Sequence, residues 1–249
     1  MRNLKLVLSY DGSDFSGWQV QPDAPTIQGT LSVALERLTG EKVLPQGSGR
    51  TDAGVHALAQ VASFTTSSVI PTENFLKALN STLPASIRVL EVCEMPAEFH
   101  ARKSALAKTY NYRMYRGTIC PPFLARYVWH YPYPLDEAAV AQAAAIVVGE
   151  HDFTSFAAVD PEIGREDGSS NLRRIFSSGW RRQADEFVYT VCGSGFLHHM
   201  VRNLVGTFLL VGKGTIKPED VSRILEERNR SAAGATAPAS GLYLTTVEY

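Results

Sequence analysis

Cysteine is scarce in this sequence of 249 residues, and long apolar runs are missing. The three cysteines (Cys93, Cys120 and Cys192) are far apart and form no C-x-x-C pair, so neither a disulfide framework nor a zinc site is indicated. No apolar run reaches the roughly 20 residues that a membrane-spanning helix needs. The apolar stretch within residues 1–10 is too short for the apolar region of a signal peptide. We therefore expect a cytoplasmic protein with no membrane partner.

An excess of positive charge is also missing. The 24 lysine and arginine residues are balanced by 25 aspartate and glutamate residues, which is not the profile of a generally basic nucleic-acid coat. An RNA partner would therefore require positive charge that is concentrated locally. The candidate clusters are Arg102-Lys103 with Lys108, Arg113 with Arg116, Arg173-Arg174, Arg181-Arg182, and Arg202. Each pair alone is typical of an ordinary solvated face, so only their convergence in the fold would make a patch.

The most distinctive stretch is the glycine-rich loop at 47–57, in which Arg50 and Asp52 lie two residues apart. In extended backbone such residues share a face, and an arginine neighbour favours the charged form of an aspartate. Strand-like sequence at 42–44 and 57–64 flanks the loop. A carboxylate held on such a loop suits a nucleophile or a general base. The alternative is a hairpin whose aspartate only caps the turn.

The apolar content of 45% is enough for one large or two small domains, and the periodicity favours two similar halves. The pattern predicts strands at 4–10, 42–44, 57–64, 87–94, 108–116, 172–182, 186–193 and 242–248, and helices at 26–38, 71–81, 136–148 and 196–211, with a short one from Pro218. Both halves approximate the order β-α-β-β-α-β, which is typical of ferredoxin-like units. We predict a mixed α/β (α+β) fold with subdomains at 1–103 and 104–249.

Further motifs lie outside the loop. The loop at 10–19 carries Phe15 and Trp18, and Trp18 is either exposed there or tucked onto the core. Tyr110 lies on an alternating strand, where periodicity alone favours core packing. Arg202 lies beside the apolar stripe of the helix at 196–211, on another side together with His199, Asn203 and Gly206. A surface salt bridge is the plainer interpretation of Arg202, and a buried arginine would need a carboxylate partner. Leu242 starts the last strand, which by itself predicts only a core position.

Taken together, these motifs resemble those of the tRNA pseudouridine synthase A family over nearly the whole chain. The similarity is carried by Gly-Arg-Thr-Asp-Ala-Gly-Val-His at 49–56 and by Tyr-Asp-Gly at 10–12 with Gly-Trp-Gln at 17–19. It extends to Lys-Thr-Tyr-Asn-Tyr at 108–112, Phe-Leu-His-His-Met-Val-Arg-Asn at 196–203 and Ala-Pro-Ala-Ser-Gly-Leu at 237–242. The loop at 160–171 has no clear match, so its contacts with RNA stay open.

The resemblance implies that Asp52 is the catalytic residue, that Tyr110 is the active-site tyrosine, that Arg202 pairs with the catalytic aspartate and that Leu242 lines the pocket. Arg50 would then fill the space of a flipped-out nucleotide or hold a phosphate. The resemblance also implies two lobes that share a mostly antiparallel sheet with a central cleft, and a homodimer. The expected activity is isomerisation of uridines 38, 39 and 40 in the tRNA anticodon stem-loop, without a cofactor. Whether Asp52 attacks the base, attacks the sugar or abstracts a sugar proton stays open.

Two other functions fit parts of the pattern. A catalytically silent RNA-binding module would need only the basic and aromatic residues. A glycosidase-like hydrolase would need a second acid across the bond, for which Asp11, Asp14 and Asp152 are the candidates. A metal site at His198-His199 is rejected, because neighbouring residues on a helix point in different directions.

Overall fold

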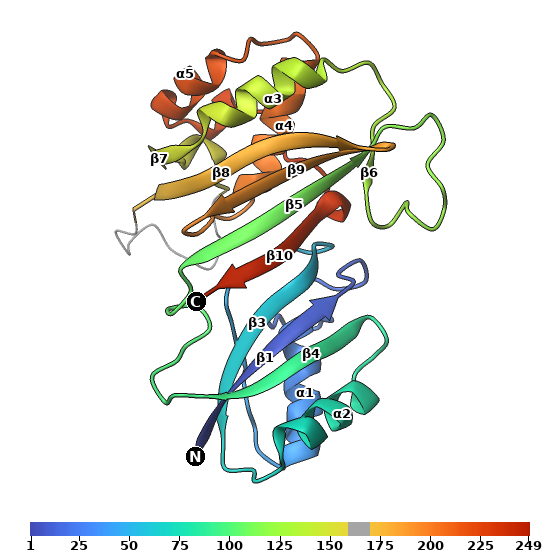
Figure 1. Cartoon of the computed structure of the whole chain (residues 1–249), viewed down its shortest axis with the longest axis vertical. Helices are drawn as coiled ribbons and strands as arrows, with labels where there is room; N and C mark the ends of the chain where they lie inside the picture. Colours follow the sequence, from blue (N-terminus) through green and yellow to red (C-terminus); the bar gives the residue numbers. More distant parts are fainter. Residues whose placement is uncertain (159–169) are drawn as a thin grey trace. The chain divides into compact units, whose positions relative to one another are not determined.

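The computed structural model describes residues 1–158 and 170–249, which form two units (Figure 1). The first unit contains Met1–Leu106 and Tyr243–Tyr249, and the second contains Ala107–Leu242. The loop expected at 160–171 falls almost entirely outside the described residues. Within the described residues, no helix combines the length and the apolar character that a membrane crossing requires.

The first unit has the order β-α-β-β-α-β, followed at the end of the chain by most of a further strand. Its elements are β1 (Arg2–Tyr10), α1 (Ile27–Thr39), β2 (Gln46–Gly47), β3 (His56–Thr66), α2 (Thr72–Thr82), β4 (Ile87–Met95) and β10 (Leu242–Glu248). β1 pairs antiparallel with both β3 and β4. Leu4, Leu6 and Leu8 alternate along β1 and are fully buried, because every second side chain of a strand faces the same side. This strand forms the centre of the unit's core.

Local sequence signals set the ends of α1. The Thr26 hydroxyl accepts a hydrogen bond from the backbone N–H of Gly29, and at the other end the Gly40 N–H donates to the Glu36 carbonyl. Ile27, Leu31 and Leu35 form the buried stripe. The expected helix at 26–38 is therefore confirmed to within one residue, because both capping signals are local.

The second unit also combines a mostly antiparallel sheet with helices. Its elements are β5 (Ala107–Tyr115), β6 (Trp129–His130), α3 (Glu137–Ile146), β7 (Gly149–Asp152), η1 (Thr154–Phe156), β8 (Leu172–Gln183), β9 (Glu186–Gly193), α4 (Met200–Gly212), α5 (Asp220–Glu227), η3 (Arg230–Ala232) and η4 (Ala239–Gly241). The strand order is β7-β8-β9-β5, and β6 runs parallel to β5. α3 packs against α4 and β8. The predicted mixed α/β class is confirmed.

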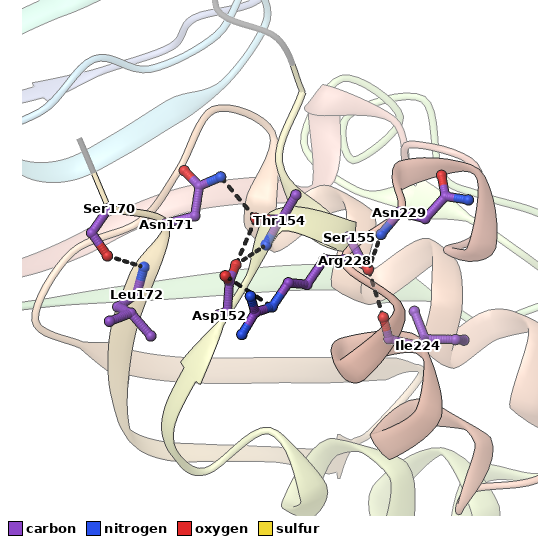
Figure 2. A network of polar contacts seen from close by, with 9 residues as sticks. All are labelled: Asp152, Thr154, Ser155, Ser170, Asn171, Leu172, Ile224, Arg228 and Asn229. Atoms are coloured by element: carbon purple, nitrogen blue, oxygen red, sulfur yellow. Dashed lines mark hydrogen bonds and ion pairs between the residues drawn. The ribbon is translucent and has the colours of Figure 1, made fainter. Parts of the chain in front are cut away.

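A polar network joins η1 to the end of α5 (Figure 2). The buried Ser155 hydroxyl donates to the Ile224 carbonyl and accepts from the Asn229 N–H. The Asp152 carboxylate accepts hydrogen bonds from the N–H and the hydroxyl of Thr154 and pairs with Arg228 at 3.2 Å. Asp152, one of the three carboxylates considered as a second acid, is thus engaged in holding a turn.

Three expectations about the elements are wrong. Residues 42–44 form no strand because Pro45 follows them and lacks a donor, and the strand before the catalytic loop is only the pair Gln46–Gly47. β6 and β7 were not expected, since one has two residues in a proline-rich stretch and the other reads Gly-Glu-His-Asp, a sequence of low strand propensity. Most of β10 belongs to the first unit, not to a subdomain at 104–249, because Tyr243 and Leu244 pair with β3.

Candidate active site

Arg50 and Asp52 lie on the loop between β2 and β3 in the first unit. The loop turns where the Val55 N–H donates to the Asp52 carbonyl at 3.1 Å. Arg50 is exposed and Asp52 half-buried, whereas Thr51 between them is buried. This alternation is what extended backbone produces when every second side chain points inward. The two charged residues of the motif are therefore carried on the accessible side of the loop.

A buried polar cluster holds the loop from below. The Thr51 hydroxyl is 2.9 Å from the Tyr10 hydroxyl on β1. The Gln60 amide on β3 donates to the Gly49 carbonyl at 3.0 Å, and its oxygen accepts from the Ser48 hydroxyl at 2.7 Å. Burial raises the pKa of Tyr10 to about 12, against the opposing effect of its bonds with Thr51 and Gln60. Because buried polar groups with partners fix a single geometry, the cluster specifies where the backbone that leads into Asp52 lies.

The loop at 11–18 packs directly on the catalytic loop, backbone against backbone. The Trp18 N–H donates to the Thr51 carbonyl at 3.0 Å, and the Gly54 N–H donates to the Phe15 carbonyl at 3.2 Å. A Cβ added at Gly12 would lie 1.9 Å from the Val55 carbonyl oxygen. Two motifs that are separate in the sequence thus form one double-loop structure.

Glycine at position 17 and tryptophan at position 18 complete this contact. Gly17 has a φ of +91°, and a Cβ there would lie 2.6 Å from the Thr51 carbonyl oxygen, so any larger residue is excluded. The Trp18 side chain is only 2% exposed, so of the two alternatives the buried one is confirmed. The Tyr-Asp-Gly and Gly-Trp-Gln segments serve to seat the loop that carries Asp52.

His56 and Asp11 extend the same contact. The buried imidazole of His56 stacks on Tyr243 with ring centroids 4.8 Å apart, and its Nδ1 lies 3.2 Å from the Gly12 nitrogen and 3.3 Å from the Asp11 carboxylate. Asp11 also accepts hydrogen bonds from the N–H and the hydroxyl of Ser13. This carboxylate, like that of Asp152, is engaged in shaping a turn.

In the second unit, Tyr110 lies on β5 opposite Val191 of β9. Its side chain is 7% exposed, and its ring meets Phe196 edge-on at a centroid distance of 5.0 Å. Tyr112 on the same face is fully buried, and its hydroxyl donates to the Pro238 carbonyl at 2.8 Å. Burial raises the pKa of Tyr112, and the positive charge of Arg202 opposes that rise. Both tyrosines are therefore buried, as the periodicity of the strand predicts, and Tyr110 is the one of the two with some remaining exposure.

Arg202 on α4 is half-buried and tied to the segment that leads to Leu242. Its Nε donates to the Ala237 carbonyl at 2.8 Å, while its own carbonyl accepts from the Ala237 N–H at 3.1 Å. Leu242 follows η4 and is 5% exposed. The second unit thus brings the 108–112, 196–203 and 237–242 motifs into contact with one another.

The helix carrying Arg202 begins later than expected and buries a different face. α4 starts at Met200 because His199 takes the left-handed conformation with φ of 59°, so residues 196–199 are not helical. The metal site at His198-His199 was rejected on the basis that both residues lie on a helix and point in different directions. That basis is wrong, because neither residue is helical and their ring centroids are 4.0 Å apart.

Asn203 was expected away from the apolar stripe but is fully buried. It donates to the Phe156 carbonyl and accepts from Arg230 and Thr236. Gly206, expected on the same side, packs closely on the Ala235 carbonyl. Both are buried because residues 234–237 cover this side of α4, which the helix's own periodicity does not reveal.

The polar cluster of Tyr10, Ser48, Thr51 and Gln60 was not predicted from the sequence. The signal was a glutamine in the middle of an apolar strand, since such a residue needs buried partners.

Comparison with known proteins adds independent findings. The family model described as tRNA pseudouridine synthase matches residues 6–102 and 143–249. A tRNA pseudouridine synthase A of Solibacter usitatus is 51% identical over 249 residues, which cover 100% of both chains. The proteins of the same name from Moorella thermoacetica and Brevibacillus brevis are 47% and 45% identical, over 99% and 100% of both chains. Among solved structures, a chain of the "Crystal Structure of a Cbf5-Nop10-Gar1 Complex" aligns over 96% of this chain and 57% of that chain, with a TM-score of 0.38 and 12% identity, too low to support a conclusion.

Proposed function

Since this chain belongs to the tRNA pseudouridine synthase family, we propose that Asp52 is its catalytic carboxylate. The enzyme is an isomerase that converts uridine in tRNA to pseudouridine. The observation that best supports the proposal is that the loop at 47–57 is held in a fixed position. A buried cluster and a second loop fix the backbone around Asp52, and the carboxylate stays on the accessible side. Such preorganisation is what a catalytic group requires.

The reaction itself needs a carboxylate and a shaped site. The bond between N1 of uracil and C1′ of ribose breaks, the base turns, and a bond between C5 and C1′ forms. The hydrogen on C5 leaves as a proton, while N1 gains one, so atoms and electrons balance without a cofactor. Asp52 supplies the nucleophile or the base for this sequence. The target nucleotide must leave its stack to reach the carboxylate.

The other motif residues take roles around the flipped base. We assign Tyr110 to stacking on the base, because its motif Lys-Thr-Tyr-Asn-Tyr at 108–112 is similar to the family's active-site tyrosine motif; such contacts contribute about 1–3 kcal/mol. Arg202, anchored through Nε by the Ala237 carbonyl, is assigned to keeping the Asp52 carboxylate charged and aimed. Arg50 is assigned to the space that the base leaves or to a phosphate, and Leu242 to the apolar lining.

The finer features are part of the same proposal. Uridines 38, 39 and 40 of the anticodon stem-loop are the proposed targets, a homodimer is the proposed assembly, and the cytoplasm is the proposed location. These follow from the similarity of the motifs to the family. The dimer is checked by light scattering, and the target positions by sequencing the modified tRNA.

The decisive test follows tritium release from tRNA labelled at C5 of uridine. We expect release by the wild-type chain and none by Asp52→Asn, with tRNA binding retained within about twofold. Asp23→Asn is the control, because Asp23 is an exposed turn residue with φ of 55°, a conformation that asparagine adopts readily. Binding without release by the wild type would support an RNA-binding module, and free uracil would support a hydrolase. Full activity in Asp52→Asn would refute the assignment of Asp52.

A further inference from the structure

A cavity of about 170 Å³ lies beside the catalytic loop, entirely within the first unit. Arg50 and Arg102 both line it, so two residues 52 positions apart in the sequence share one space. The other lining residues are neutral, and they are Trp18, Gln19, Gln28, Leu44, Gln46, Gly47 and Gly49. Two guanidinium groups without a carboxylate in the lining make this cavity suited to an anion.

The floor of the cavity is rigid. The indole of Trp18 lies so close to Gly47 that a Cβ there would come within 2.6 Å of the ring. Gln28 is 2% exposed, and both ends of its amide bond the backbone: the oxygen accepts from the Val20 N–H, and the nitrogen donates to the Pro45 carbonyl, each at 3.0 Å. The walls therefore exist before a ligand arrives, which lowers the entropic cost of binding.

Arg102 emerges from a backbone that is fixed on both sides of the preceding residue. The N–H of the buried Ala101 donates to the Ser63 hydroxyl on β3 at 3.0 Å, and its carbonyl accepts from the Tyr249 hydroxyl at 2.8 Å. The Arg102 side chain is exposed and makes no ion pair with a carboxylate within the described residues. By contrast, Arg113 and Arg116 in the second unit are paired with Glu186 and Glu137. Arg102 is thus held in place while its charge stays available.

We propose that this cavity binds one backbone phosphate of the tRNA, held between Arg102 and Arg50. Guanidinium groups bind phosphate oxygens through paired, charge-assisted hydrogen bonds. Since Arg50 is two residues from Asp52, the bound phosphate belongs to the nucleotide that reacts or to its neighbour in the strand. Arg102 is then a binding residue that sets the register of the RNA against the carboxylate. This inference rests on the proposed function and names a contact for the substrate of that site.

The test compares Arg102→Ala with Lys103→Ala in the full-length chain, using anticodon stem-loop RNA. Lys103 is the matched control because it is exposed, adjacent and equally charged but does not line the cavity. We expect Arg102→Ala to raise the Kd about tenfold, to lower the salt slope of log Kd by about 0.7–0.9, and to raise KM more than it lowers kcat. Lys103→Ala should change Kd less than about twofold. Thermal melting checks that both variants are folded.

A second measurement locates the phosphate. Stem-loop RNAs in which a single phosphate is replaced by a neutral methylphosphonate are bound to the wild type and to Arg102→Ala. At one position next to the target uridine, the replacement should weaken wild-type binding about tenfold and leave the binding of the variant unchanged.

Three results would overturn the cavity site. The first is that Arg102→Ala binds the RNA as tightly as the wild type. The second is an equal loss of RNA affinity in Arg102→Ala and Lys103→Ala. The third is that no methylphosphonate position weakens wild-type binding while leaving the binding of Arg102→Ala unchanged. The proposed function fails separately, by a wild-type chain that binds the RNA without releasing tritium. In that case the binding data alone still decide whether the cavity holds a phosphate.

Discussion

At the level of single residues, the buried Tyr10 hydroxyl gives a prediction about stability at high pH. Burial raises its pKa to about 12, whereas tyrosine in an unfolded chain titrates near about 10. Between these values the folded state binds the proton more tightly, so the free energy of unfolding falls as the pH rises from about 10 to 12. The contribution, fully present below about pH 10, amounts to roughly 2–3 kcal/mol. In Tyr10→Phe the fall over this range should be smaller by that amount.

Urea unfolding at several pH values between about 8 and 12 measures this difference. Tyr133→Phe is the control, because it removes the same oxygen from an exposed side chain. The other buried tyrosines are present in all three proteins and cancel in the comparison. An alkaline fall in Tyr10→Phe as steep as in the wild type would contradict the prediction.

Charged positions of the site are easier to identify from the sequence than buried polar ones. Arg50 and Asp52 could be predicted on one face because the alternation of extended backbone is a local rule. Asn203 was placed on the wrong side because its three partners come from η1, η3 and the segment before η4. Helical periodicity gives the direction of a side chain but says nothing of what covers it.

At the level of elements, the sequence predicts well where local signals mark an end. Thr26 and Asp136 cap α1 and α3 with their side chains, and both helix starts were expected within one residue of their positions. The start of α4 was missed because the left-handed backbone at His199 has no mark in the sequence such as glycine. The docking of the 11–18 loop on the catalytic loop was missed because it is made mostly by backbone atoms.

This docking predicts that Gly12→Ala impairs catalysis more than tRNA binding. The added methyl group would lie 1.9 Å from the Val55 carbonyl oxygen, so the turn that begins at Asp52 must shift by an ångström or more. A displacement of about 1 Å can cost roughly 100-fold in rate. We expect kcat for tritium release to fall about 10- to 100-fold, while the Kd for tRNA changes less than about threefold.

Gly179→Ala on β8 is the matched control, because its added Cβ has no neighbour within 4 Å. It should keep the wild-type kcat. If Gly12→Ala also kept it, the backbone contact would not position Asp52, and the role of the Tyr-Asp-Gly segment would lie elsewhere.

At the level of the whole molecule, the two halves could be predicted from the sequence, but the return of the last strand to the first half could not. The first part of the first unit ends at Leu106, close to the expected boundary after residue 103. The unit also contains Tyr243–Tyr249 from the end of the chain. The pairing of β3 explains the arrangement. Its residues Ala62 and Ser63 pair with β2, which leaves His56 and Ala57 to pair with β10. A parallel pairing between residues almost 190 positions apart has no local signature, so periodicity cannot predict it.

The returning strand predicts that the end of the chain stabilises the beginning. Truncation after Leu242 removes the fully buried Leu244, the stacking of Tyr243 on His56, and the acceptor that the Glu248 carbonyl offers to the Leu106 N–H. Burial of two such large side chains contributes on the order of 3–6 kcal/mol, an upper value for an extended unfolded chain. The stacking on His56 and the hydrogen bond from Leu106 are made within the first unit, where the strand also pairs with β3, so that unit should lose stability while β8 and β9 of the second unit keep their pairing.

Hydrogen exchange of the truncated chain separates the two units. Amides of β1 and β3 should exchange much faster than in the wild type, and those of β8 and β9 should stay protected. The full-length Leu244→Ala variant is a milder test of the same contact and should show a smaller loss, again in β1 and β3. Because β3 begins with His56, which touches the loop at 11–18, the truncation should also lower tritium release. Equal loss of protection in β8 and β9 would instead mean that the two units unfold as one, and that the last strand stabilises the whole molecule.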